Sequence, residues 1–167
     1  MEIRPPDAPL DAFFAPVRRR HPDVDIVVLP RQGPAPSTRP IDEGQVDATL
    51  GRVAGTAGRA WEAALRSTTA PVVGLGFGPD QGTVVASARA SATAPDGIGA
   101  LVALRGALEG EGWRMRHRAG AVERLSGVRG DVRVQASYSE STGALLLEVR
   151  SGPMYVGPAR ARELARR

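Results

Sequence analysis

The sequence predicts an α+β fold, a two-layer sandwich in which helices cover one face of a mostly antiparallel sheet. Two segments, 42–65 and 96–110, carry apolar residues at helical spacing. Short segments of alternating apolar and polar residues, bounded by turn-forming residues, follow each of them. The 167 residues also suffice for a hydrophobic core without disulfides, and the chain has no cysteine.

Residues 1–40 are predicted to form an N-terminal segment outside the main domain. Apolar residues at helical spacing predict a short helix over 10–17, with Asp7 as its N-cap. The β-branched residues of 24–29 predict a strand, and the proline-rich stretch 30–40 predicts a linker.

The main α+β domain is predicted over residues 41–157, and it begins with a long helix. Asp42 and Gln45 have the spacing of a capping box. A second stripe, next to the apolar one, consists of Gly51, Gly55 and Gly58, and it indicates either close packing on the sheet or a groove for another chain. The apolar stripe itself holds helical spacing throughout and consists of Val46, Leu50, Val53, Ala57, Trp61 and Leu65.

A β-hairpin and a second helix are predicted next. The strands 72–77 and 84–90 flank a turn at 78–82 that contains glycine, proline and aspartate. Asp96 can cap the second helix. The apolar positions expected to face the core in that helix are Ile98, Leu101, Val102, Leu104 and Leu108.

A four-stranded meander is predicted to complete the sheet, with strands at 113–118, 122–128, 132–138 and 144–150. Pro158 then opens a short basic helix or tail over 158–167. Alternation along the last two strands turns one set of side chains toward the core, namely Val132, Val134, Ala136, Tyr138, Leu145, Leu147 and Val149.

The strand over 114–118 has the sharpest pattern in the chain, because its three arginines alternate with other residues and so share one face. We expect His117, on the opposite face, to be partly buried and hydrogen-bonded in the core. Two arginines of the later strands also alternate with core residues and point away from the core. The predicted binding surface is therefore a sheet face formed by Arg114, Arg116, Arg118, Arg133 and Arg150.

The basic charge of the chain comes entirely from arginine, because it contains no lysine. Twenty-two arginines exceed eighteen acidic residues and give a net charge of +4. Residues 96–167 account for this excess, with twelve arginines and eight acids. The lack of lysine and asparagine also indicates a GC-rich coding sequence, as in many actinobacteria. Arginine binds carboxylates and phosphates with two parallel hydrogen bonds, so clustered arginines favour recognition of acidic groups.

Catalysis, cofactor binding and membrane insertion receive little support from the sequence. Its two histidines belong to no recognisable catalytic motif, and we expect no enzymatic activity, no cofactor and no metal site. No apolar run approaches the roughly 20 residues of a membrane helix. The first residues lack the pattern of a signal peptide, so we expect a cytoplasmic protein that does not bind membranes.

These observations predict a non-enzymatic protein–protein interaction module. The adaptor, secretion-chaperone and immunity types are named by analogy with the general character of such small proteins. The module's arginine-rich sheet face would bind an acidic surface of a partner. The alternative is a nucleic-acid-binding module that uses the same arginines together with the basic C-terminal segment. A small-molecule pocket between helices and sheet is a third hypothesis, and an exposed strand edge would also permit a homodimer.

Overall fold

The computed structural model describes residues 19–20, 39–66 and 69–166. The chain divides into two compact units, residues 1–34 and 35–167. In the first unit the described residues are Arg19 and Arg20, which are helical. The predicted helix over 10–17 and the predicted strand over 24–29 lie outside the described residues.

The second unit has an α+β fold built on one antiparallel sheet, as the sequence predicts. The sheet order is β1-β2-β6-β5-β4-β3, and the short β7 pairs with the first residues of β2. Strand β6 therefore lies between β2 and β5, next to a strand that is far away in the sequence. The elements in chain order are α2 (Glu43–Leu65), β1 (Val72–Phe77), β2 (Thr83–Thr93), α3 (Gly97–Gly110), β3 (Arg114–Arg118), β4 (Val122–Arg129), β5 (Val132–Ser139), β6 (Ala144–Arg150), β7 (Met154–Tyr155) and α4 (Pro158–Leu164).

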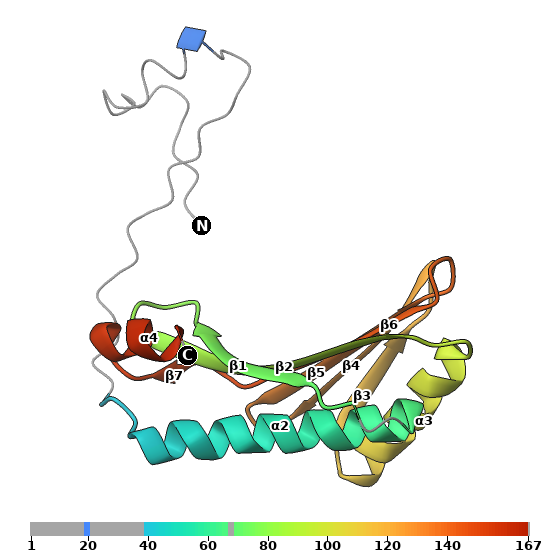
Figure 1. Ribbon diagram of the computed structural model, residues 1–167, viewed down its shortest axis with the longest axis horizontal. Coiled ribbons are helices and arrows are strands. Elements are labelled where there is room, and N and C mark those ends of the chain that lie inside the picture. The colour runs from blue at the N-terminus through green and yellow to red at the C-terminus, as the bar shows by residue number, and fades with distance from the viewer. Residues whose placement is uncertain (1–18, 21–38, 67–68, 167) are drawn as a thin grey trace. The chain divides into compact units, whose positions relative to one another are not determined.

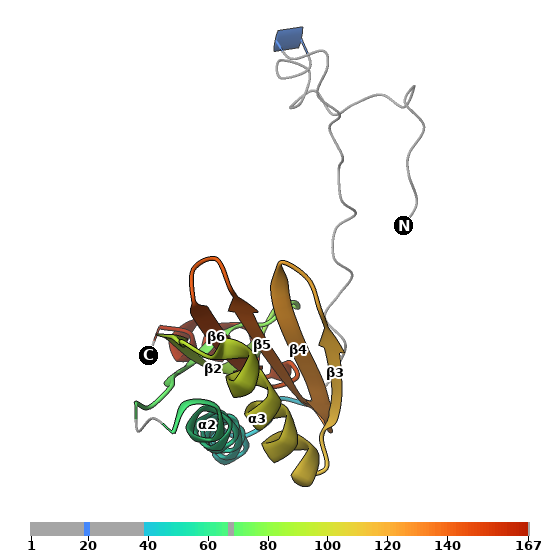
Figure 2. The same ribbon diagram turned by 90° about the vertical axis from the view of Figure 1, so that its right-hand side faces the viewer.

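Helices α2 and α3 lie side by side on the same face of the sheet (Figures 1 and 2). Helix α2 packs on β2, β6 and β1, and α3 packs on β5, β3 and β4. The short α4 packs beside β1 and β2, and an ion pair of 2.6 Å between Arg160 and Glu43 ties it to the start of α2. Ala161 and Leu164 of α4 belong to the hydrophobic core. In the part of the chain that the structure describes, no helix meets the length and apolarity needed to cross a membrane.

The capping box predicted for α2 is confirmed. The Gln45 N–H donates to Asp42 Oδ1 at 2.8 Å, and the Asp42 N–H donates to Gln45 Oε1 at 3.3 Å. These two bonds satisfy backbone donors that a helix start otherwise leaves free. Gly51 and Gly58 have no atom within 4 Å of the position a Cβ would take, so close packing on the sheet does not explain them.

Helix α3 faces the sheet with a stripe that only partly matches the prediction. Leu101, Leu104 and Leu108 are buried, but Ile98 and Val102 are 54% and 65% exposed, so their predicted place in the core is wrong. The reason lies at the start of the helix, where a Cβ on Gly97 would come within 2.0 Å of the Tyr138 ring. This close approach turns the stripe of Gly97, Ala100, Leu101, Leu104 and Leu108 toward the sheet and leaves Ile98 and Val102 in solvent.

The strands confirm the predicted hairpin, meander and direction of side chains. All seven residues assigned to the core from β5 and β6 are buried beneath α2 and α3, together with Leu125 of β4. Strand β2 is longer than predicted and reaches Thr93. Strand β7 was not predicted, because two residues are too few to form a pattern of alternation.

Candidate functional site

The face of the sheet opposite α2 and α3, called the open face below, brings the predicted arginines together. Strand register aligns its side chains in rows that cross the sheet. In the first row, Arg114 of β3 lies opposite Val128, which lies opposite Arg133 of β5, which in turn lies opposite Arg150 of β6. Because directly opposed residues of antiparallel strands share a face, these three arginines form one surface.

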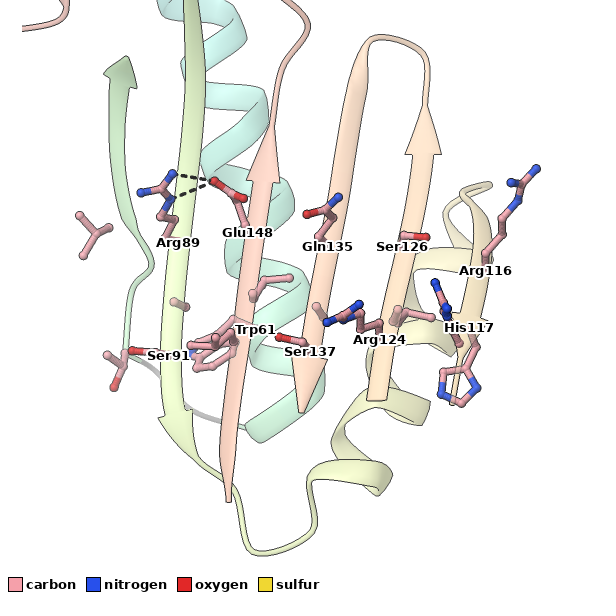
Figure 3. Close-up of a pocket in the computed structure, with 18 of the residues that line it drawn as sticks. Trp61, Arg89, Ser91, Arg116, His117, Arg124, Ser126, Gln135, Ser137 and Glu148 are labelled. Atoms are coloured by element: carbon pink, nitrogen blue, oxygen red, sulfur yellow. Dashed lines mark hydrogen bonds and ion pairs between the residues drawn. The ribbon is translucent and has the colours of Figure 1, made fainter. Parts of the chain in front are cut away.

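Two further rows extend this surface. The second runs from Arg116 through Ser126 and Gln135 to Glu148 and Arg89, and Figure 3 shows these five side chains in that order across the strands. The third row runs across the same strands and consists of Arg118, Arg124, Ser137, Leu146 and Ser91.

Arginine dominates the charge of the open face. These three rows contain seven arginines but only one acidic residue, Glu148, and all seven arginines are exposed. Two of the seven, Arg89 and Arg124, were not predicted as part of the site. The full set is Arg89, Arg114, Arg116, Arg118, Arg124, Arg133 and Arg150.

Most of these arginines lack a partner in the described part of the chain. Glu148 binds Arg89, with 2.8 Å between its Oε1 and Arg89 Nη2 (Figure 3), and its Oε1 lies 3.9 Å from Arg150 Nε. The structure gives no ion pair to the other five within the residues it describes, namely Arg114, Arg116, Arg118, Arg124 and Arg133.

Two cross-strand pairs place arginine directly opposite arginine. Arg118 faces Arg124 between β3 and β4, and Arg133 faces Arg150 between β5 and β6. Like charges directly opposite each other destabilise a sheet, by an amount similar to the roughly 0.2–1 kcal/mol of a favourable pair. The open face therefore carries a cost that folding alone does not explain.

The open face is also hollowed. A cavity of about 1210 Å³ is lined by charged side chains of β2, β3, β4 and β6 and by Gln135 of β5. Its charged lining residues are Arg89, Arg116, Arg118, Arg124 and Glu148. Apolar residues also line the cavity, among them Leu146, which is 50% exposed, and Val72, which is 78% exposed.

His117 does not belong to the core, so this prediction is wrong. Its side chain is 43% exposed, and Nε2 lies 2.6 Å from Oε2 of Glu123 on the neighbouring strand. The ring stays exposed because β3 is an edge strand and no further strand lies beyond it. Met115, two residues away on the same face, packs against Gly127, where a Cβ would come within 2.2 Å of its Sδ.

A second cluster of charges, between α2 and the turn after β4, is internally paired. Arg59 Nε lies 2.9 Å from Oε1 of Glu111, Arg129 lies 3.7 Å from Oε2 of the same carboxylate, and Arg52 lies 3.3 Å from Asp131. The hydrogen bond from Arg59 lowers the pKa of Glu111, despite some burial, and the same bond raises the pKa of Arg59. These charges stabilise one another and offer little to a ligand.

The cavity beside this cluster, of about 440 Å³, is lined by Gly51 and Gly55 of α2. Two of the three glycines of the stripe thus border a groove on α2, and the charged residues around that groove already pair with one another. Within the described residues, no group of three histidine and acidic side chains is placed to hold a metal ion.

Comparison with known proteins finds no family model that matches the chain, and no curated protein or solved structure with significant similarity. A function for this protein is therefore inferred from the chemistry of its open face.

Proposed function

We propose that this protein is a non-enzymatic interaction module that binds an acidic surface of a partner protein through the open face of its sheet. Its role would be of the adaptor, secretion-chaperone or immunity type. The observation that carries the proposal is the unmatched charge of the open face, where seven arginines accompany one glutamate.

Unpaired arginines suit this role because each guanidinium can bind a carboxylate with two parallel hydrogen bonds. The two opposed arginine pairs lower the stability of the free protein, and a carboxylate placed between the members of each pair would relieve that repulsion. Arginine is also enriched among the residues that dominate the affinity of protein interfaces. The free energy lost in the isolated sheet would then be recovered on binding.

Nucleic acid is the less favoured partner. Proteins that bind single strands stack bases on aromatic side chains, and the three rows of the open face contain no aromatic residue. The C-terminal segment contributes less free charge than its sequence indicates, because Arg160 pairs with Glu43 and Glu163. Arg162, in contrast, is exposed on α4 and forms no ion pair within the described residues.

The test is an affinity capture from the native host with wild-type protein, Arg116→Glu and Arg162→Glu. The two variants change the net charge equally, but only the first lies on the open face. We expect wild-type and Arg162→Glu protein to retain the same partner at near-equal stoichiometry. Arg116→Glu should lose that partner, with an affinity at least about 30-fold lower, which corresponds to about 2 kcal/mol.

The thermal midpoint of Arg116→Glu should stay close to that of the wild type, because an exposed side chain without an ion pair contributes within about 0.5 kcal/mol. Equal retention of the partner by both variants would contradict the proposal. Co-purified nucleic acid that elutes with salt, and whose binding both substitutions weaken, would favour a nucleic-acid-binding module instead. Each phosphate contact makes the affinity for nucleic acid fall with salt concentration.

A further inference from the structure

We propose that β1 pairs with β1 of a second copy of this chain, and that the resulting dimer has one sheet running through both subunits. The two edges of the sheet differ in a way that points to β1. Strand β3 at one edge carries Arg114, Arg116 and Arg118, and charges of this kind protect an edge from pairing. Strand β1 at the other edge, with the sequence VVGLGF, contains no charged residue and no proline.

Strand β1 is also exposed. Val72 is 78% exposed, Phe77 is 64% exposed and Val73 is 38% exposed, although α2 and α4 both contact this strand. The positions that a Cβ would take at Gly74 and Gly76 have no atom within 4 Å, so the open face of the edge is uncovered beside them. An uncharged, apolar strand edge of six residues is a template for another strand.

The hydrogen-bond pattern of β1 limits the register of such a pairing. The Gly78 N–H donates to the Thr83 carbonyl at 2.9 Å, toward β2. Because the bonding direction alternates along an antiparallel strand, Gly76 and Gly74 also bond toward β2. Val73, Leu75 and Phe77 therefore direct their backbone N–H and C=O groups outward, and each can pair only with an outward-directed residue of another strand.

A second copy satisfies this requirement about a two-fold axis through Leu75. Leu75 then lies opposite the partner subunit's Leu75, and Val73 lies opposite the partner subunit's Phe77. In the dimer, Val73 and Phe77 of each subunit, both exposed in the single chain, are covered by the partner subunit, so two symmetry-related pairs form. Pairs of an aromatic and a β-branched residue favour sheet formation. Because each subunit uses the same strand in this two-fold contact, the assembly is complete as a dimer and adds no third subunit. It also brings no like charges together, since residues 69–78 carry none.

The dimer would place two arginine-rich surfaces on the same side of one continuous sheet, because directly opposed residues share a face. A partner with two acidic sites would then bind more tightly than the single surface allows. This consequence rests on the proposed function, whereas the dimer itself does not.

The oligomeric state of the full chain tests the proposal, measured by sedimentation equilibrium from about 1 to 200 μM, since a short interface dissociates on dilution. We expect the wild-type mass to rise toward twice the chain's 17.5 kDa. Val73→Lys and Phe77→Ser should remain monomeric throughout, and circular dichroism should show that both are folded. Arg116→Glu should dimerise like the wild type, which separates this test from that of the proposed function.

The register can be tested by cross-linking, because the natural chain has no cysteine. Directly opposed, hydrogen-bonded residues have Cα atoms about 5.5 Å apart, within the range that a disulfide spans. Under diamide oxidation, a mixture of Val73→Cys and Phe77→Cys proteins should therefore form more covalent dimer than either variant alone. A monomeric wild type over the whole concentration range, a dimer that survives Val73→Lys, or cross-linking by the single variants alone would overturn the proposal.

Discussion

The two faces of the sheet consist of alternate residues of the same strands, yet they have opposite chemistry. In β5 and β6 the residues under the helices are valine, alanine, tyrosine and leucine, whereas most of those on the open face are arginine, glutamine, serine and glutamate. Helix coverage explains the first set, because apolar side chains are removed from water there. It does not explain why the second set is so rich in one charge. The difference separates residues that fold the protein from residues available to bind.

The largest expected effect is a difference in the free energy of unfolding between substitutions at two neighbouring leucines of β6. Leu145 is fully buried beneath the helices, and Leu146 is 50% exposed on the open face. Leu145→Ala should lower the free energy of unfolding by about 2–5 kcal/mol, because it removes buried methyl groups and leaves a cavity. Leu146→Ala should lower it by only about 0.5 kcal/mol. Urea denaturation of both variants measures the difference, and equal losses would contradict the assignment of the two faces.

A smaller effect of opposite sign is expected on the open face. Arg133 lies directly opposite Arg150, so Arg133→Gln should raise the free energy of unfolding by about 0.2–1 kcal/mol. The gain should be larger at low ionic strength, where the repulsion is less screened.

Arg162→Gln is the matched control for this substitution, because Arg162 is exposed on α4 rather than paired across strands with another arginine. Thermal unfolding at low and high salt compares the two variants. If Arg133→Gln destabilised the protein, Arg133 would contribute to folding, and the contrast between the faces would be weaker than we infer.

Much of this contrast could be predicted from the sequence, because it depends on local patterns. The Asp42 and Gln45 capping box, the hairpin, the meander and the inward residues of β5 and β6 all follow from spacing within single elements. The common face of Arg114, Arg116 and Arg118 follows from alternation in the same way. Their role in binding stays a prediction.

What could not be predicted depends on neighbours that are distant in the sequence. Arg89 belongs to the open face because β6 lies beside β2, and no local pattern reveals that strand order. Arg124 does alternate with buried Leu125, so its side of the sheet could have been found from sequence, but its position opposite Arg118 depends on the register of β3 and β4. The exposure of Ile98 depends on the packing of Gly97 against Tyr138, which the apolar pattern of α3 does not contain.

The smallest expected effect concerns Glu111. Unlike most charges on the open face, its carboxylate forms an ion pair within the protein, with Arg59. The hydrogen bond from Arg59 lowers the pKa of Glu111 in the folded state. A lowered pKa means that this carboxylate adds stability above its unfolded pKa of about 4.3, and that the contribution is lost as the pH falls through the folded pKa. Wild-type protein should therefore be more stable than Glu111→Gln at pH 7, by no more than about 1 kcal/mol because both side chains reach solvent.

The difference in thermal midpoint between wild-type and Glu111→Gln protein should shrink as the pH falls below about 4, where the carboxylate takes up its proton. Added salt should reduce it at pH 7, because the ion pair is partly exposed. Arg133→Gln should behave differently, since its stabilisation removes repulsion between two arginines that stay protonated throughout this range. If the difference in thermal midpoint between wild-type and Glu111→Gln protein did not depend on pH, the Arg59–Glu111 pair would act by packing alone. The paired and unpaired charges of this protein would then no longer differ as proposed.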